Sequence, residues 1–209
     1  MITNMETARL KIVNTATTLF LRYGFKNVTI DDIAHEGHLS KKTIYQHFPG
    51  KEQLISAVLQ ELELKIRKQL DRLLSGSKNP IVAFFHIHHY IFMQQFNQKN
   101  TIFPSLKKYY PIQYSLFCYT IEKLVHEKTS EQLEKGINEG IFIPGSDTES
   151  YGHLLYHVSF HITNNTSVLH EHRIDQEVLV KDLVYYALWS VATPSGRLLL
   201  EKTGINHPA

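Results

Sequence analysis

Residues 29–53 read TIDDIAHEGHLSKKTIYQHFPGKEQ, and this stretch decides the fold. Thr29 can cap a short helix, with Asp32 three residues later completing a capping box, and a glycine can end that helix. Ser40 can cap a second short helix over 41–48, which a Pro-Gly pair stops. Two short helices joined by a tight turn, the second carrying paired lysines, predict a helix-turn-helix.

The rest of the chain has the three- and four-residue apolar spacing of helices, and no stretch alternates with period two as a strand would. Ahead of the quoted stretch, an apolar stripe stops at Gly24, where a helix can finish with a left-handed residue. Beyond the stretch we expect helices at about 51–74, 80–97, 104–109, 111–139, 147–170, 175–193 and 197–202. The sequence therefore predicts an all-α chain.

A Ser-Gly-Ser-Lys-Asn-Pro segment at 75–80 is the clearest linker in the sequence. It predicts an N-terminal domain over 6–66, with the helix-turn-helix at 29–48, joined by a long helix to a second helical domain over 75–209. Residues 1–74 hold 11 Lys and Arg against 8 Asp and Glu, whereas the remainder holds 11 against 12. The small basic surplus therefore belongs to the half with the helix-turn-helix.

The second short helix has the residue types that a DNA major groove requires. The groove is about 12 Å wide, so the outward side chains must be short or flexible polar groups. The inward residues Leu39, Ile44 and Phe48 must pack on the neighbouring helices to hold it rigidly. The caps Thr29 and Ser40 leave backbone N–H groups directed outward, where a phosphate can bind.

About the first 60 residues resemble the TetR/AcrR family of bacterial transcriptional repressors, and the remainder is similar only in helix pattern and length. The matching residues are Ala16, Phe20, Gly24, Thr29, Ile33, Ala34, Gly37, Ser40, Thr43, Ile44, Tyr45, Phe48, Lys51 and Leu54. A generic helix-turn-helix would not be followed by Tyr-x-x-Phe-x-x-Lys-Glu and a long helix. The chain departs from the family at His38-Leu39, where a valine is frequent, and at Pro49 in the turn; neither is a DNA-facing position.

The resemblance implies a role for each matching position on the DNA side. Thr29 would contact a phosphate through its hydroxyl and the amide end of its helix. Tyr45 and His47 would reach phosphates from the second helix, and Lys51 would do so from the start of the fourth. The candidates for base edges are Lys41, Lys42, Thr43 and Gln46, because lysine suits guanine, glutamine suits adenine and a threonine methyl suits thymine. Which of them contacts a base stays open, since phosphate contacts outnumber base contacts.

The second half is rich in aromatic residues. In the resembled family this half holds a ligand cavity among its helices, and its last two long helices pair with a second subunit. Aromatic side chains with polar tips can line such a cavity. The candidates for its lining are Phe85, His88, Phe92, Tyr110, Tyr114, Phe117, Cys118, Tyr156, His157 and Phe160. The alternative is that these residues form ordinary core and dimer interface.

Histidine is unusually frequent, with 13 in the chain. His153, His157 and His161 are spaced i, i+4 and i+8, and an i, i+4 pair lets two imidazoles hold one metal ion. No convergent carboxylate or thiolate is evident in the sequence, so polar side chains satisfied in a pocket or dimer seam are the simpler interpretation. We therefore predict no metal and keep these three residues as candidates, with a pH-sensitive element as a further option.

Composition and missing motifs exclude several classes of protein. One cysteine excludes a disulfide framework, and no apolar run approaches the roughly 18 residues that span a bilayer. The first residues lack a signal-peptide pattern, so we expect a soluble, cytoplasmic protein without a membrane contact. Gly-x-Ser-x-Gly, a Walker loop and a dinucleotide fingerprint are all missing, so we expect neither an enzyme nor a cofactor.

Together with the helix-turn-helix pattern, the resemblance implies a homodimeric regulator that binds double-stranded DNA at a palindromic operator mirroring its two-fold axis. It would be a repressor released by a small-molecule effector. One alternative is a metal- or ligand-responsive sensor or activator whose histidine-rich C-terminal half is the main functional site. Another is a degenerate interaction module, which the intact DNA-facing residues argue against.

Overall fold

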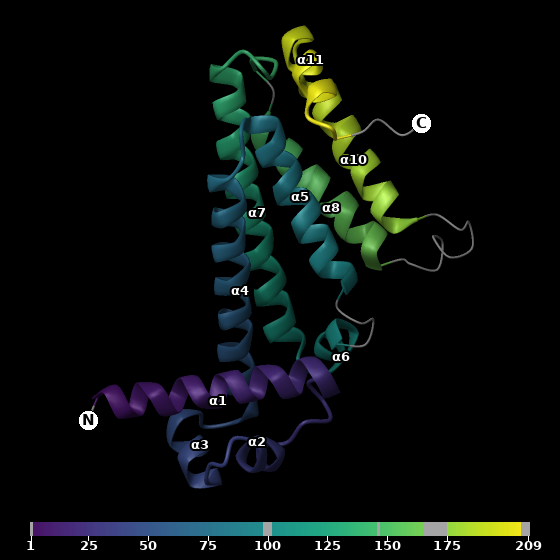
Figure 1. The fold of residues 1–209 in the computed structure, drawn as a ribbon. Coiled ribbons are helices and arrows are strands. Elements are labelled where there is room, and N and C mark those ends of the chain that lie inside the picture. Colours follow the sequence, from purple (N-terminus) through teal and green to yellow (C-terminus); the bar gives the residue numbers. More distant parts are fainter. Residues whose placement is uncertain (1, 98–101, 146, 165–174, 206–209) are drawn as a thin grey trace. The chain divides into compact units, whose positions relative to one another are not determined.

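The computed structural model describes residues 2–97, 102–145, 147–164 and 175–205 (Figure 1). Within these ranges the regular secondary structure is helical, apart from one isolated antiparallel bridge between Phe142 and Ala192. The all-α prediction is confirmed. The end of the helix expected over 147–170 lies outside the described residues.

The first of two compact units comprises Met1–Ile66 and Gln98–Thr120. Its helices are α1 (Ile2–Tyr23), α2 (Ile30–Glu36), α3 (Lys41–His47), the first part of α4 (Lys51–Ser75), α6 (Ile102–Tyr109) and the start of α7 (Pro111–Asn138). Apolar residues at helical spacing bury one face of each helix in a shared core that includes Ile12, Ala16, Phe20, Ile33, Ile44, Leu54 and Leu106. Phe20 stacks on Phe25 with ring centroids 5.0 Å apart, which ties the end of α1 to the loop before α2.

The caps predicted for the helix-turn-helix are present. Thr29 caps α2 in a capping box with Asp32, and the Ser40 hydroxyl caps α3 by accepting a hydrogen bond from the Thr43 amide. Gly37 ends α2, as the sequence predicts, and the residue after it has an unusual backbone conformation. The residue with a left-handed backbone is His38, at φ 48°, whereas the C-cap Gly37 stays right-handed. Position 37 requires a glycine for steric reasons, because a Cβ there would lie 2.9 Å from the Ile33 carbonyl oxygen.

The second unit comprises Arg67–Asn97 and Ile121–Ala209. It contains the later parts of α4 and α7 together with α5 (Pro80–Asn97), α8 (Thr148–Asn164), α10 (Gln176–Val191) and α11 (Pro194–Lys202). Its core includes Ile81, Phe84, Phe92, Leu133, Phe142, Val184, Leu188 and Leu200. Phe142 packs so closely on α7 that a Cβ at Gly136 would lie 2.1 Å from its ring. The bridge between Phe142 and Ala192 joins the end of α10 to the loop that follows α7.

The two units do not follow the contiguous division that we expected from the linker. Residues 98–120 belong with the N-terminal helices, because Leu106 is fully buried in their core and Tyr110 packs against it. A linker pattern marks a break in helix propensity, but it carries no information on which core a later segment joins. As a result, α4 and α7 each contribute residues to both units.

Candidate nucleic-acid interface

Helix α3 exposes nearly all of its side chains. Ile44 is its one buried residue, and it anchors the helix in the core of the first unit. The other six are Lys41, Lys42, Thr43, Tyr45, Gln46 and His47; of these Thr43 and His47 are half-buried and the rest are exposed. Tyr45 has 52% of its surface exposed, although tyrosine is usually more buried. The helix contains no carboxylate, so it presents a basic and hydrogen-bonding surface of the kind that a major groove accepts.

The two predicted cap residues are engaged within the protein. The Thr29 hydroxyl and its amide each donate to an Asp32 carboxylate oxygen over 2.7 Å, and these hydrogen bonds lower the pKa of Asp32. Ser40 Oγ lies 2.8 Å from Thr43 Oγ1. Both caps therefore hold the starts of α2 and α3 first of all, and a phosphate near Thr29 would also meet the Asp32 charge.

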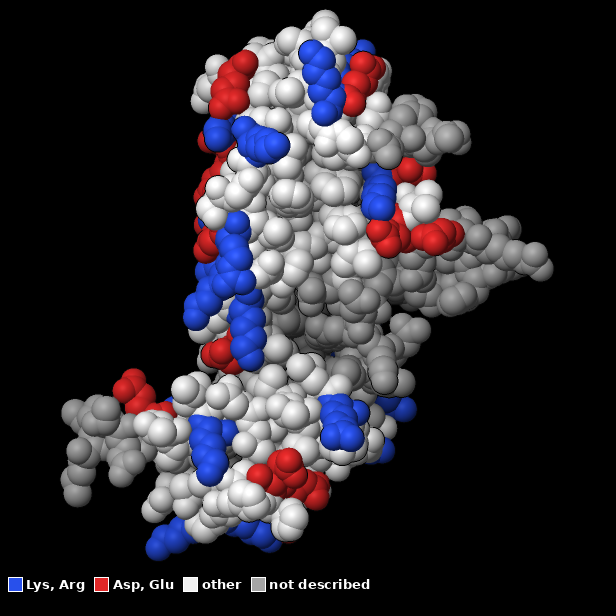
Figure 2. Space-filling model, in the orientation of Figure 1, with Lys and Arg blue, Asp and Glu red and all other residues white. Residues whose placement is uncertain are grey.

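The paired lysines differ in their surroundings. Lys41 Nζ lies 2.7 Å from the Asp31 carboxylate on α2, and this hydrogen bond and charge raise the pKa of Lys41. Both partners are exposed, so the pair contributes little to stability. Lys42, one residue later, is also exposed. Figure 2 shows that basic and acidic side chains also lie near one another on the surface over α1 to α3, in separate small patches.

Lys51 is directed toward its own unit. Its ammonium donates to the Lys26 carbonyl oxygen over 3.2 Å and lies 5.8 Å from the Phe20 ring centroid and 5.5 Å from that of Tyr110. These contacts join the start of α4 to α1, the loop before α2 and the segment after α6. In this conformation Lys51 holds the helix-turn-helix in place, a role that the sequence pattern alone did not indicate.

The residues that we predicted to line a ligand cavity fall into both units. Tyr110, Tyr114, Phe117 and Cys118 belong to the first unit, whereas Phe85, His88, Phe92, Tyr156, His157 and Phe160 belong to the second. In the first unit, the three aromatic residues pack against the core, and Phe117 stacks on Phe103 at 5.8 Å. Burial raises the pKa of Tyr114.

In the second unit, several of the predicted lining residues are core residues. Phe92 and Tyr156 are almost fully buried, and Phe160 stacks on Tyr156 at 6.1 Å. His88 is also buried, with its Nε2 3.1 Å from the Thr129 hydroxyl, and burial lowers its pKa to about 3. The neutral imidazole therefore acts as a satisfied polar group inside the core.

A pocket of about 310 Å³ opens in the second unit between α5, α10 and the chain after α11. Its lining residues are Val82, Phe85, His86, Lys181, Thr203, Gly204 and Ile205. Only Phe85 was among the predicted lining residues. The others escaped sequence analysis because half of them come from the C-terminal segment, which carries no aromatic signal. The mixed apolar and polar lining suits a small organic ligand.

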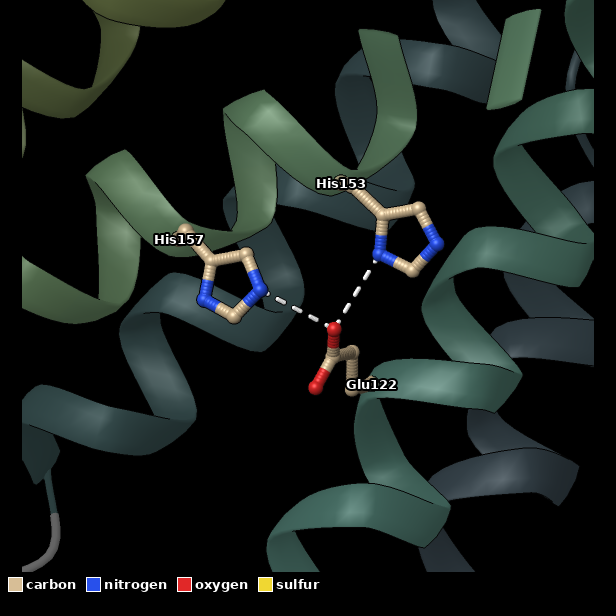
Figure 3. A group of neighbouring side chains, drawn as sticks. All are labelled: Glu122, His153 and His157. Atoms are coloured by element: carbon tan, nitrogen blue, oxygen red, sulfur yellow. Dashed lines mark hydrogen bonds and ion pairs between the residues drawn. The ribbon is translucent and has the colours of Figure 1, made fainter. Parts of the chain in front are cut away.

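The histidines of α8 meet a carboxylate from another helix. His153 Nδ1 and His157 Nε2 lie 3.1 and 3.0 Å from the same oxygen of Glu122, on α7 (Figure 3). These three residues are the one group among the described residues whose ligand atoms are close enough to hold a metal ion together. His161, predicted as a third candidate, is exposed and lies outside this group. The sequence did not reveal Glu122, because its proximity to α8 arises only from the fold.

Among the described helices, no segment combines the length and the apolar character needed to cross a bilayer.

Residues 12–58, which run from α1 into α4, match the family model described as bacterial regulatory proteins, tetR family. Over 82 residues the chain is 29% identical to the HTH-type transcriptional regulator HbdR of Aromatoleum sp. (strain CIB), a match that covers 39% of this chain and 36% of HbdR. The chain spans about a third or less of the length of the curated relatives that it matches.

Solved structures share the fold over most of the chain. A putative TetR-family transcriptional regulator from Mesorhizobium loti MAFF303099 has a TM-score of 0.70 at 17% identity, covering 90% of this chain and 98% of that one. A transcriptional regulator, FadR from Bacillus subtilis in complex with stearoyl-CoA, has a TM-score of 0.67 at 14% identity, covering 87% and 98%. At these identities the similarity shows the fold alone.

Proposed function

Because its helix-turn-helix segment is that of a TetR-family regulator, we propose that the chain is a sequence-specific DNA-binding transcriptional regulator. The observation that carries this is the exposed, carboxylate-free surface of α3, held rigidly by Ile44 and by the Ser40 cap. A binding protein of this kind needs no catalytic group. It would act on the bacterial chromosome, in the cytoplasm.

On DNA, α3 would enter the major groove with Lys42 and Gln46 toward base edges and Tyr45 and His47 toward phosphates. Lys41 would have to leave or share its ion pair with Asp31, so it would add less than Lys42. Lys51, held by the Lys26 carbonyl and two rings, would support the interface from behind as well as through its charge. Thr29 would contribute its amide-bearing helix end more than its hydroxyl, which Asp32 already engages.

The regulator would be a repressor that a small molecule releases from its operator. The pocket at Phe85, His86 and Lys181 is a site of suitable size for the effector. An effector can release the protein only by binding more tightly to a conformation that fits DNA poorly. Helices α4 and α7 are the candidate route for that change, because each contributes residues to both units.

A homodimer formed by α8 and α10 would place two α3 helices on a palindromic operator. Its support is the exposure of large apolar side chains on these two helices: Leu154 is 62% exposed, Val178 51% and Tyr186 53%. Large apolar side chains exposed in the single subunit are candidates for burial at such an interface. Light scattering after size-exclusion chromatography should give a dimer for the wild type and a monomer for Leu154→Glu with Tyr186→Glu.

Leu198→Glu is the matched control for the dimer, because Leu198 is 60% exposed but lies on α11. This variant should remain a dimer. A wild-type monomer at micromolar concentration, or dissociation by Leu198→Glu alone, would contradict the assignment to α8 and α10.

The DNA-binding proposal is tested by selecting genomic fragments with the purified protein and measuring affinity for the enriched palindrome over a series of salt concentrations. Lys42→Ala should weaken binding. If Lys42 contacts a phosphate, the slope of log affinity against log salt should also fall by about 1; if it contacts a base, the base preference at one operator position should be relaxed. Tyr45→Phe should weaken binding without changing the slope, because it removes a hydroxyl and no charge.

Lys202→Ala, which removes an exposed lysine from α11, is the control and should leave affinity and slope unchanged. Failure of the wild type to enrich any sequence, or an equal loss in Lys202→Ala and Lys42→Ala, would argue against a DNA interface on α3.

A further inference from the structure

We propose that Glu122, His153 and His157 form a binding site for a divalent transition-metal ion of the zinc class. The three side chains come from two helices: Glu122 from α7, and the two histidines from successive turns of α8. Figure 3 shows both imidazoles directed at the carboxylate from the same side. This inference goes beyond the proposed regulatory function and does not depend on it.

The distances fit a metal with little rearrangement. The Glu122 oxygen lies 3.1 Å from His153 Nδ1 and 3.0 Å from His157 Nε2, and all three ligand atoms lie within 4.8 Å of one another. With metal–ligand bonds of about 2.0–2.1 Å, the ligand atoms of a tetrahedral zinc site are about 3.3 Å apart. Two of the three distances between ligand atoms are therefore already close to the value in a tetrahedral zinc site. A metal would replace the two N–H hydrogens that now face the carboxylate, each ring carrying its proton on the opposite nitrogen.

The chemistry of the three ligands favours a particular class of ion. Two imidazoles with one carboxylate suit zinc and its neighbours in the first transition row, whereas magnesium and calcium prefer oxygen ligands throughout. Three protein ligands leave a fourth position of a tetrahedron open, as in sites that bind water or an exogenous ligand. In the single subunit the His153 and His157 side chains are 44% and 61% exposed, so an ion and a fourth ligand can reach the triad before α8 pairs with a second subunit.

Neighbouring rings hold the two histidines in position. His126, one turn beyond Glu122 on α7, stacks on His153 with ring centroids 4.6 Å apart, and Tyr156 contacts His157 edge-on at 5.7 Å. His126 Nε2 is buried and has no hydrogen-bond partner among the described residues. Packing of this kind restricts the rotamers of the ligands before an ion arrives.

An ion at this site would join α7 to α8. Each helix would then be held to the other by bonds to the metal as well as by packing. Because the unfolded chain lacks the assembled triad, the ion would bind the folded state preferentially and raise the melting temperature in a concentration-dependent way.

The test is direct titration of the untagged, full-length protein, freed of metal with a chelator, with Zn²⁺ by calorimetry and with Co²⁺ by visible absorption. The wild type should bind one ion per chain at the triad, with the absorption of tetrahedral Co²⁺. Glu122→Gln, His153→Gln and His157→Gln should each weaken the binding at least about 100-fold, beyond the loss usual for residues that only support metal ligands. His161→Gln is the matched control on α8 and should bind as the wild type does.

Circular dichroism verifies that each variant is folded. Should a triad variant fail to fold, acylation of the wild-type histidines read by mass spectrometry replaces it: Zn²⁺ should protect His153 and His157 and leave His161 reactive. The proposal is overturned by a wild type that binds no ion, by unchanged affinity in Glu122→Gln, or by equal losses in His161→Gln. None of these results bears on DNA binding, which is measured without added metal.

Discussion

The buried imidazole of His88 should make the second unit less stable in mild acid, and replacing it with glutamine should remove that effect. His88 is 4% exposed, lies 4.6 Å from the Phe84 ring, and keeps its Nε2 3.1 Å from the hydroxyl of Thr129. Burial lowers its pKa from 6.5 to about 3. The unfolded chain therefore binds a proton at His88 in a pH range where the folded chain does not, so stability falls as the pH falls below 6.5.

The size of the effect follows from the two pKa values. Between the two pKa values, each unit by which the pH falls well below 6.5 lowers the free energy of unfolding by about 1.4 kcal/mol. Relative to pH 7, His88 alone should lower the free energy of unfolding by about 0.7 kcal/mol at pH 6 and by about 2 kcal/mol at pH 5. Glutamine does not titrate and still offers the Thr129 hydroxyl a polar partner, so His88→Gln should lose this part of the pH dependence.

The assay is urea unfolding of both proteins at pH 5, 6 and 7, followed by the fluorescence of Trp189. This is the chain's one tryptophan, and it lies in the same unit as His88. The other 12 histidines contribute to both profiles and cancel in the difference between the two proteins. Parallel profiles for the wild type and His88→Gln would refute the reasoning, because they would mean that His88 is protonated equally in the folded and unfolded states.

Three further substitutions test particular local features. Gly136→Ala would place a Cβ 2.1 Å from the Phe142 ring and should destabilise the second unit by about 1–3 kcal/mol in the same fluorescence assay. His38→Gly should stabilise the first unit by about 1 kcal/mol, because His38 adopts φ 48° in the turn; a lower melting temperature by circular dichroism would contradict this. Thr29→Ala should lower that melting temperature by the equivalent of about 1 kcal/mol through loss of the α2 cap, and an unchanged value would show that the cap is dispensable.

Much of the fold could be predicted from the sequence because its signals are local. Caps at Thr29 and Ser40 and helical apolar spacing depend on residues within one or two turns, so they specify where helices begin and which face is buried. The assignment of residues 98–120 to the first unit is not a local property. It depends on Leu106 reaching a core built from residues 12–59, and no spacing rule encodes such a pairing.

The same limit applies to the candidate interface. The identity of the α3 side chains could be read from the sequence, and so could their exposure around the buried Ile44. The contacts that these side chains make with neighbouring elements could not be read from the sequence. Lys41 faces Asp31, and Lys51 turns to the Lys26 carbonyl, and both contacts involve elements before α3 in the chain. The sequence therefore tells us that a lysine carries a positive charge in this motif. The partner of that lysine in the folded chain decides whether the charge is available to a phosphate.

The position of Glu122 connects the candidate metal site to the question of how a signal could reach α3. Glu122 lies two residues beyond the segment 98–120 that belongs to the first unit, on the helix that contributes to both units. An ion that holds this part of α7 to α8 favours the arrangement of the triad in which the metal–ligand distances are nearest to their optimum of about 2.0–2.1 Å. If DNA favours the same arrangement, thermodynamic linkage requires that DNA raise the metal affinity by the factor by which the metal raises the DNA affinity. A coupling factor above one, found in both directions, would support α7 as the element that connects the two sites, whereas a factor of one would confine the ion to the stability of the second unit.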